Sequence, residues 1–150
     1  MHEQIYTFKS VAELQDFAAD FASRLQPGDH LGLIGELGAG KTTFVQGLAR
    51  GLGCTVVPDS PTFTLRQSLD CTTSTGIAEL IHVDLYRLED EQAIEELGLL
   101  DDLTDPVTLV AIEWIDRAPL LGARLRYRLE FSWDAHNDRR QLRIIDQRYE

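Results

Sequence analysis

The chain has few lysines and cysteines, and it has no long apolar segment. Lysine occurs only as Lys9 and Lys41, so a lysine inside a motif does not arise from lysine-rich composition. No run of about 18 apolar residues occurs, which excludes a membrane-spanning helix. The first residues lack the basic start and apolar stretch of a secretory signal. Internal repeats, low-complexity tracts and linkers are also lacking, so we expect one domain over residues 1–150.

The two cysteines, Cys54 and Cys71, are isolated in the sequence. Their spacing matches neither a metal site nor the framework of a disulfide-rich protein. We therefore predict reduced thiols, which are the ordinary state of cysteine inside cells. A cytoplasmic protein that does not bind membranes is the corresponding expectation.

The net charge of -11 disfavours a protein that binds nucleic acid by itself, because such proteins usually present a basic face. The charge is unevenly distributed. Residues 89–105 contain eight acidic and no basic side chains, whereas eight arginines follow from Arg117 onward. Two ordinary solvated faces would produce this pattern, and so would surfaces that meet partners of opposite charge. The sequence leaves both interpretations open.

The most informative segment is residues 35–42, Gly-Glu-Leu-Gly-Ala-Gly-Lys-Thr. It matches the phosphate-binding loop pattern of Gly, four residues, Gly-Lys and then Ser or Thr. An apolar run at 31–34 predicts a buried strand before it, and Phe44, Leu48 and Leu52 predict a helix after it. Such a turn directs backbone N–H groups and the positive end of the helix dipole toward an anion. A glycine-rich turn without a ligand is the alternative.

The motif predicts roles for particular side chains. Lys41 is expected to bridge the outer phosphates of a nucleotide, and the Thr42 hydroxyl to ligate Mg²⁺. Acids for Mg²⁺ and the attacking water are expected just past apolar strands, at the carboxyl edge of the sheet. Asp84 follows the apolar segment 80–83, and Glu113 follows the apolar segment 109–112. Either acid could serve the metal or the water, unless it only caps a helix or lies at a solvated edge.

The segment Ser60-Pro61-Thr62-Phe63 is a further candidate for the site. A hydroxyl on a loop that follows the helix of a phosphate-binding loop is able to close over the terminal phosphate and Mg²⁺. A Ser-Pro turn that leads into a strand is the structural alternative.

The hydrophobic periodicity predicts helices that alternate with strands. Helices are expected at residues 11–25, from 41 to the glycines at 51 and 53, and at 90–97, and strands at 31–34, 63–69, 77–83, 108–112, 125–133 and 141–147. We therefore predict an α/β fold, a layered domain like those of P-loop NTPases. Its central sheet should be mixed and largely parallel, with a C-terminal antiparallel hairpin.

Five segments in this order resemble the TsaE (YjeE) family of bacterial ATPases over residues 10–117. They are the loop at 35–43, Ser-Pro-Thr-Phe-Thr-Leu at 60–65, His-Val-Asp-Leu-Tyr-Arg-Leu at 82–88, Glu-Glu-Leu-Gly-Leu at 95–99 and Ile-Glu-Trp at 112–114. The second and third are the most distinguishing, because many enzymes share the loop. The family often continues with Pro, Glu and Lys where this chain has Ile115, Asp116 and Arg117, which affects the expected loop path but not Glu113.

The resemblance implies Mg²⁺-dependent ATP hydrolysis in an assembly with TsaD-like and TsaB-like proteins. That machinery makes N6-threonylcarbamoyladenosine beside the anticodon of tRNA, so contact with tRNA would be indirect, through the complex. The residues expected to contact ATP are Gly38, Ala39, Gly40, Lys41, Thr42, Thr43 and Thr62. The expected catalytic residues are Lys41, Asp84 and Glu113, and Thr42, Asp84 and Glu113 are expected at the metal. Trp114 resembles the family's tryptophan beside the acid, with a core aromatic as the alternative.

Two other nucleotide-binding functions fit the loop less well. A small-molecule kinase usually carries a basic lid, but only Arg66 and Arg87 are basic between Arg50 and Arg117. A GTP-driven switch usually selects guanine with Asn-Lys-x-Asp, which is absent here, and Asp84 is not followed by the glycine that such switches use. The kinase remains the alternative function.

Overall fold

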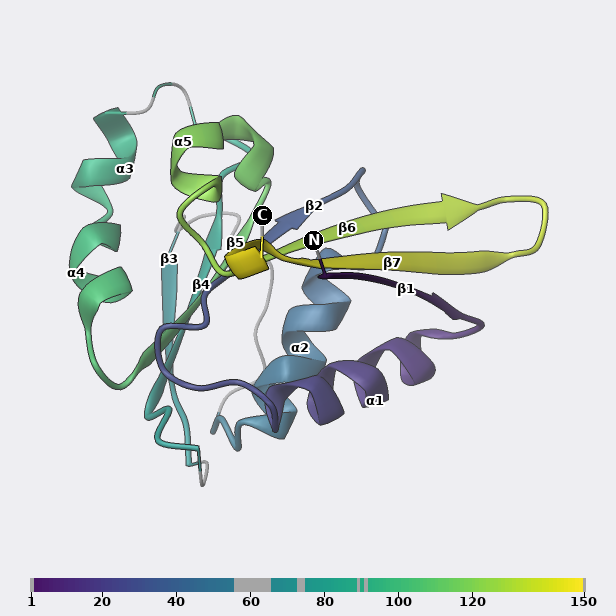
Figure 1. The fold of residues 1–150 in the computed structure, drawn as a ribbon, viewed down its shortest axis with the longest axis horizontal. Coiled ribbons are helices and arrows are strands. Elements are labelled where there is room, and N and C mark those ends of the chain that lie inside the picture. The colour runs from purple at the N-terminus through teal and green to yellow at the C-terminus, as the bar shows by residue number, and fades with distance from the viewer. Residues whose placement is uncertain (1, 56–65, 73–74, 89, 91, 150) are drawn as a thin grey trace.

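A seven-stranded mixed sheet forms the centre of the protein in a computed structural model that describes residues 2–55, 66–72, 75–88, 90 and 92–149 (Figure 1). The strands are β1 (His2–Phe8), β2 (Leu31–Ile34), β3 (Arg66–Asp70), β4 (Glu79–Asp84), β5 (Thr108–Glu113), β6 (Tyr127–Asp134) and β7 (Arg139–Asp146). Their order across the sheet is β1-β7-β6-β2-β5-β4-β3. The four central strands β6, β2, β5 and β4 are parallel, whereas the β6–β7 hairpin, β1 and β3 pair in antiparallel fashion. The predicted fold class is confirmed.

Helices cover both faces of the sheet and create two hydrophobic cores. They are α1 (Val11–Ala22), α2 (Lys41–Gly51), α3 (Gln92–Glu96), α4 (Leu99–Thr104) and α5 (Pro119–Gly122), with short 3-10 turns η1 (Ile115–Arg117) and η2 (Gln147–Tyr149). One core lies under α1 and α2, and the other lies under α3, α4 and α5 (Figure 1). In β5, Leu109 and Ala111 join the first core and Val110 and Ile112 the second. Because both faces are covered, β5 is apolar along most of its length.

The contact between α1 and α2 holds the phosphate-binding loop against the rest of the fold. Ser10 caps α1, since its side chain accepts a hydrogen bond from the backbone N–H of Glu13 at 3.1 Å. Gly47 lets the two helices approach closely: a β-carbon at this position would lie 2.8 Å from the Cβ of Ala18. The helix that begins at the loop is therefore packed along its length.

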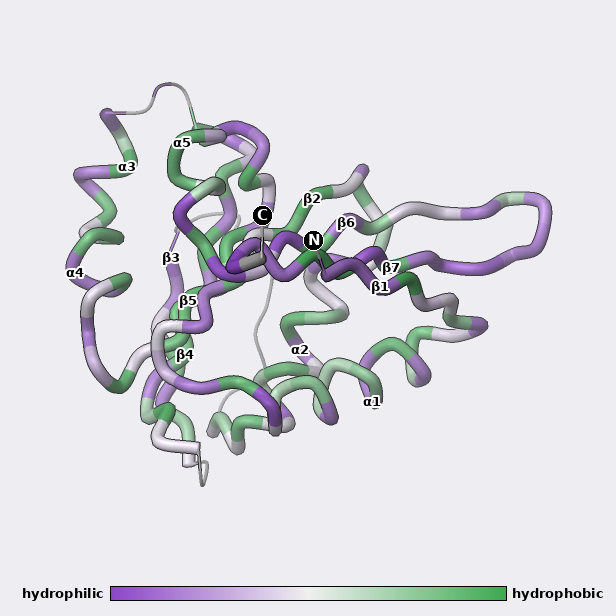
Figure 2. The backbone as a smooth tube through the Cα atoms, viewed as in Figure 1, coloured by the Kyte–Doolittle hydropathy of each residue, from purple (hydrophilic) through white to green (hydrophobic). Residues whose placement is uncertain are grey.

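The β6–β7 hairpin projects beyond the helices, and its tip is hydrophilic (Figures 1 and 2). No helix in the described part of the chain is long and apolar enough to cross a membrane.

Ion pairs within the chain account for much of the arginine-rich C-terminal segment. Arg143, for example, pairs with Glu3 and Glu130, and Arg126 pairs with Asp29 and Asp146. These contacts favour the interpretation of that segment as an ordinary charged face.

The prediction of two separate reduced thiols is wrong, because Cys54 and Cys71 form a disulfide. Cys54 follows the end of α2, and Cys71 follows the end of β3. Backbone hydrogen bonds from Thr55 to the Asp70 carbonyl at 3.1 Å and from Thr72 to the Gly53 carbonyl at 3.2 Å bring the two segments together. No pattern in the sequence indicates this disulfide, because the pairing of distant segments, and not a recognisable cysteine spacing, makes the two residues neighbours.

Arg126 joins three parts of the chain at a largely buried ion cluster, and its loss is expected to destabilise the fold. Its Nη1 lies 2.8 Å from Asp29 Oδ1, its Nη2 lies 3.2 Å from Asp146 Oδ2, and the three side chains are 18%, 15% and 13% exposed. Arg126→Met would leave the Asp29 carboxylate without its cation and Asp146 with only Arg148, 3.2 Å away, so we expect a loss of about 3 kcal/mol in the free energy of unfolding, measured with urea. The exposed neighbour gives the control, because Arg124→Met should change stability by less than about 0.5 kcal/mol.

The stability that this ion cluster contributes is expected to depend on pH. Burial raises the pKa of Asp146, but the hydrogen bond from Arg126 and the backbone N–H of Arg148 outweigh it and hold that pKa below its usual value. A carboxyl with a depressed pKa contributes stability above its unfolded-state pKa of about 3.9, and the contribution is lost as the pH falls through the folded-state value. Equal loss of stability in Arg124→Met and Arg126→Met at pH 7 would contradict the role of the cluster.

Candidate functional site

The loop between β2 and α2 adopts a backbone that requires glycine. Gly38 and Gly40 have φ angles of 78° and 118°, in the region that residues with a β-carbon rarely adopt. A β-carbon at Gly40 would also lie 2.8 Å from Cδ2 of Leu14, so α1 supports the loop from behind. Gly40 is the N-cap of α2, and the helix begins at Lys41. The loop and the helix N-terminus together form a cradle for an anion.

The Lys41 ammonium lies inside this loop. The residue is 5% exposed, and its Nζ donates hydrogen bonds to the backbone carbonyls of Gly35 and Glu36. The Nζ also lies 4.2 Å from the centroid of the Trp114 ring, which covers it as a cation–π contact. Burial lowers the pKa of Lys41, while the carboxylates of Glu113 and Asp84 oppose that shift. The loop thus holds a desolvated cation between its own carbonyls and an indole ring.

Asp84 and Glu113 meet at the carboxyl edge of the sheet. They end the parallel strands β4 and β5 and are register partners. The Thr42 hydroxyl lies 3.1 Å from both carboxylate oxygens of Glu113, and Oδ1 of Asp84 accepts a hydrogen bond from the Tyr86 N–H at 2.8 Å. Burial raises the pKa of Asp84; the Tyr86 N–H opposes this shift and Glu113 reinforces it. The two acids that were predicted from separate strand ends therefore lie beside the loop.

These residues line one pocket of about 130 Å³. Its lining residues are Leu37, Gly38, Gly40, Lys41, Thr42, Thr43, Asp84, Glu113 and Trp114. A larger cavity of about 540 Å³, which extends from β2 to α5, contains no residue of the loop. We assign the site to the smaller pocket, because it combines a cation, acids and the loop backbone. Ala39 is buried and does not line it, and Thr62 lies outside the described residues.

The oxygen atoms at this pocket fit Mg²⁺ better than they fit a transition metal. The available donors are the Thr42 hydroxyl and the carboxylates of Glu113 and Asp84. Within the described ranges, no group of three or more His, Cys, Asp and Glu side chains has the geometry of a metal site. Mg²⁺ does not need such a group, since it is commonly held by one or two carboxylates together with substrate phosphates and water.

Comparison with known proteins places the chain in a family. The family model described as threonylcarbamoyl adenosine biosynthesis protein TsaE matches residues 8–142. The chain belongs to the TsaE family. A tRNA threonylcarbamoyladenosine biosynthesis protein TsaE from Bacillus subtilis (strain 168) is 44% identical over 106 residues, which cover 71% of this chain and 59% of that relative. The chain thus matches less than two thirds of the length of that relative.

Further members of the TsaE family and a solved structure agree with this result. A TsaE protein from Nostoc sp. is 41% identical over 115 residues, which cover 69% of this chain and 68% of that relative. The crystal structure of YdiB from Bacillus subtilis superposes with a TM-score of 0.68 and 28% identity, and the alignment covers 97% of this chain and 86% of that one. The similarity in fold therefore extends over nearly the whole chain.

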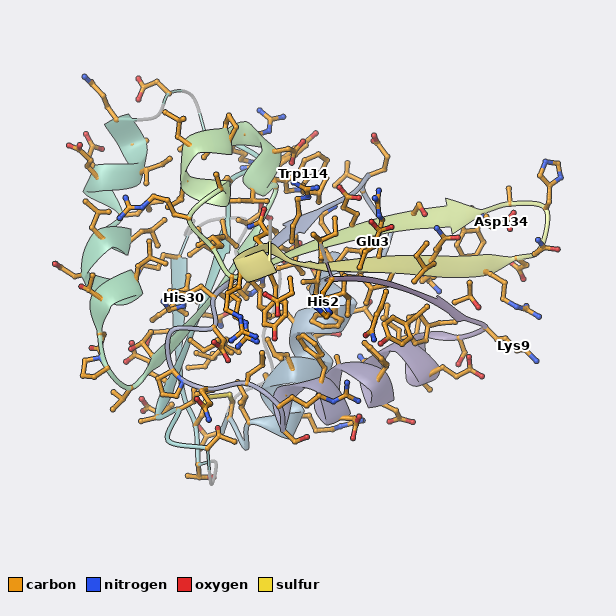
Figure 3. All side chains as sticks on the ribbon, in the orientation of Figure 1. His2, Glu3, Lys9, His30, Trp114 and Asp134 are labelled. Carbon is orange, nitrogen blue, oxygen red and sulfur yellow. A yellow bond between two sulfur atoms is a disulfide. The ribbon has the colours of Figure 1, made fainter. Side chains whose placement is uncertain are left out.

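Trp114, which the resemblance to the TsaE family singled out, lies at one wall of the pocket. It follows β5, at the opposite end of the parallel strands from His30, which precedes β2 (Figure 3). Its φ of 60° is left-handed, which is uncommon for a residue with a β-carbon. Its ring lies 4.9 Å from that of Tyr86, and the Arg117 guanidinium lies 5.8 Å from it. The strained backbone thus turns the indole toward Lys41.

His82 is the residue near the site that the sequence reasoning missed. It lies in β4, two residues before Asp84, and it is fully buried. Its Nε2 lies 2.5 Å from Oε2 of Glu113. A signal was available, because residues two apart in a strand face the same side of the sheet. A histidine two positions before a predicted site acid was therefore a candidate neighbour of that site.

Proposed function

We propose that this chain binds ATP with Mg²⁺ and hydrolyses it in the cytoplasm. It would do so as one component of an assembly with TsaD-like and TsaB-like proteins that forms N6-threonylcarbamoyladenosine in tRNA. The observation that carries the proposal is the convergence of Lys41, Thr42, Asp84 and Glu113 at one pocket, in a chain of the TsaE family. The net charge of -11 is consistent with indirect contact to tRNA, through the partners.

The positions of these residues support separate roles in binding phosphate, binding Mg²⁺ and orienting water. The backbone N–H groups of the loop and the Lys41 ammonium would bind the β- and γ-phosphates. The Thr42 hydroxyl and the carboxylate beside it would hold Mg²⁺, which when bound neutralises charge on the phosphate oxygens. Asp84 and Glu113 would divide metal binding and the orientation of the attacking water between them. Trp114 covers Lys41 and limits the access of water to it.

The alternative of a small-molecule kinase gains no support from the described residues. Arg66, one of two candidates for a basic lid, is held by Asp102 through two hydrogen bonds of 2.8 Å. A side chain that is bound in this way at β3 is not available to close over the donor phosphates. A phosphate-transfer assay against small acceptors would separate a kinase from an ATPase.

Depletion of the protein in its host is expected to deplete N6-threonylcarbamoyladenosine in tRNA. The expectation follows from membership of the TsaE family, and mass spectrometry of tRNA nucleosides measures it. Re-expression of the wild-type chain should restore the modified nucleoside. Normal levels after verified depletion would refute the proposed pathway.

A further inference from the structure

We propose that His82 is a positioning residue that holds the Glu113 carboxylate in the orientation needed for ATP hydrolysis. The inference rests on the proposed function of the pocket and adds a residue to it. His82 does not line the pocket and would not touch the nucleotide. It would act through its hydrogen bond to Glu113.

The strand register explains why His82 reaches Glu113. His82 pairs with Ala111, and Asp84 pairs with Glu113, on the neighbouring parallel strands β4 and β5. His82 and Ala111 therefore face the same side of the sheet as the two acids. Ala111 is fully buried and small, which leaves room for the imidazole to extend along the sheet toward Glu113. The 2.5 Å contact between His82 Nε2 and Glu113 Oε2 is the result.

The Glu113 carboxylate is held from two sides. His82 Nε2 contacts Oε2 from β4, and the Thr42 hydroxyl from α2 lies 3.1 Å from each oxygen. The side chains of His82 and Glu113 are 0% and 3% exposed, so water does not compete for the bond between them. Two donors from separate elements restrict the carboxylate more than either does alone, and partners of this kind commonly orient the residues that carry out the chemistry.

A comparison of the two buried histidines separates a structural role from a positioning role. Both ring nitrogens of His30 contact the backbone, with Nε2 2.9 Å from the Leu103 carbonyl and Nδ1 accepting from the Val110 N–H at 3.0 Å. His82 instead has one nitrogen on Glu113 and an Nδ1 without a hydrogen-bond partner in the described parts of the chain. A buried polar atom without a partner costs free energy that an apolar residue would avoid. The bond to Glu113 is the contact that an apolar residue at this position would lose.

The test compares His82→Leu, His82→Asn and His82→Gln. Leucine removes the donor, asparagine places an N–H near the position of Nδ1, and glutamine places one near Nε2. We expect ATP hydrolysis with TsaD and TsaB to fall about 10- to 100-fold in the leucine and asparagine variants and to recover most of that loss in the glutamine variant. ADP affinity without Mg²⁺ should stay within about twofold of wild type, because the loop is unchanged. Equal rates of ATP hydrolysis in all three variants would overturn the proposal. His30→Gln is the control for a structural histidine, and it should lower the stability of the protein but not its rate of ATP hydrolysis.

A double-mutant cycle gives a second criterion. In a Glu113→Gln background, His82→Leu should lower hydrolysis much less than it does in the wild-type chain, because residues that act as a unit are not additive. Equal fold losses in the two backgrounds would mean that His82 acts elsewhere. If the leucine variant does not fold, the same cycle is measured with asparagine.

A third measurement tests the bond without ATP. In the apo protein labelled with ¹⁵N-histidine, the resonance of the His82 Nε2 proton is identified by its loss in His82→Gln. It should shift upfield in Glu113→Gln, because a bond to a neutral amide is weaker than one to a carboxylate. An unshifted resonance would refute the bond. If wild type does not hydrolyse ATP with its partners but the shift occurs, the proposed function fails and the His82–Glu113 contact stands.

Discussion

Lys41→Ala is expected to abolish productive binding of ATP and its hydrolysis. Lys41 is the only lysine or arginine that lines the pocket within the described part of the chain, and its ammonium lies at the point where the loop carbonyls and Trp114 exclude water. Removing a preorganised electrostatic group from such a site costs on the order of a hundredfold or more in rate. Calorimetry with ATP and Mg²⁺, and hydrolysis with TsaD and TsaB, measure the two losses.

The other lysine of the chain provides the control for this substitution. Lys9 is exposed and lies just before α1, far from Trp114 (Figure 3). Lys9→Ala removes the same charge from the protein, so a general effect of net charge would affect both variants. We expect Lys9→Ala to bind and hydrolyse ATP as the wild type does. Unchanged ATP affinity and unchanged hydrolysis in Lys41→Ala would refute the assignment of the pocket.

Local patterns in the sequence predicted the parts of the fold that form the site. The apolar segments before the loop and before Glu113 predicted β2 and the core of β5 within a residue, because strands covered on both faces are apolar throughout. The loop motif predicted where α2 begins. The helix predicted at 90–97 is α3, which ends at Glu96, and Gly98 follows it with a left-handed φ of 74°. Convergence of Asp84 and Glu113 followed from the rule that parallel strands end at the same edge.

The features that were missed depend on contacts between distant segments. Strand β1 is mostly exposed, so it carries little hydrophobic alternation, and it exists because residues 2–8 pair with β7. Helices α4 and α5 span 6 and 4 residues, too few for a helical period to be recognised. The Cys54–Cys71 disulfide and the His82–Glu113 hydrogen bond each join two elements that are far apart in the sequence, and no local pattern shows that these elements are neighbours. Thr62, predicted on a switch-like loop, lies outside the described residues and stays a prediction.

Hydrolysis of ATP is expected to be slow in the isolated chain and much faster with TsaD and TsaB. The pocket contains acids and a metal-binding hydroxyl, but beyond Lys41 it has no lysine or arginine among its described lining residues. A cation supplied by a partner, or a loop ordered by one, commonly activates enzymes of this class, and a supplied arginine alone gives on the order of a thousandfold. Steady-state hydrolysis with and without both partners measures the effect. Equal turnover with and without the partners would show that they do not activate ATP hydrolysis.

Glu113→Gln is expected to lower that partner-stimulated turnover about a hundredfold or more, because the change keeps the size of the side chain and removes its charge. The affinity for ATP with Mg²⁺ then separates two roles. If Glu113 orients and polarises water, the variant should bind ATP as the wild type does and hydrolyse it slowly. If Glu113 mainly holds Mg²⁺ beside the Thr42 hydroxyl, 3.1 Å away, affinity should fall together with rate. The exposed Glu95→Gln in α3 is the matched change of charge and should leave both quantities unaltered. Wild-type turnover of Glu113→Gln in the assembled complex would exclude Glu113 from the mechanism.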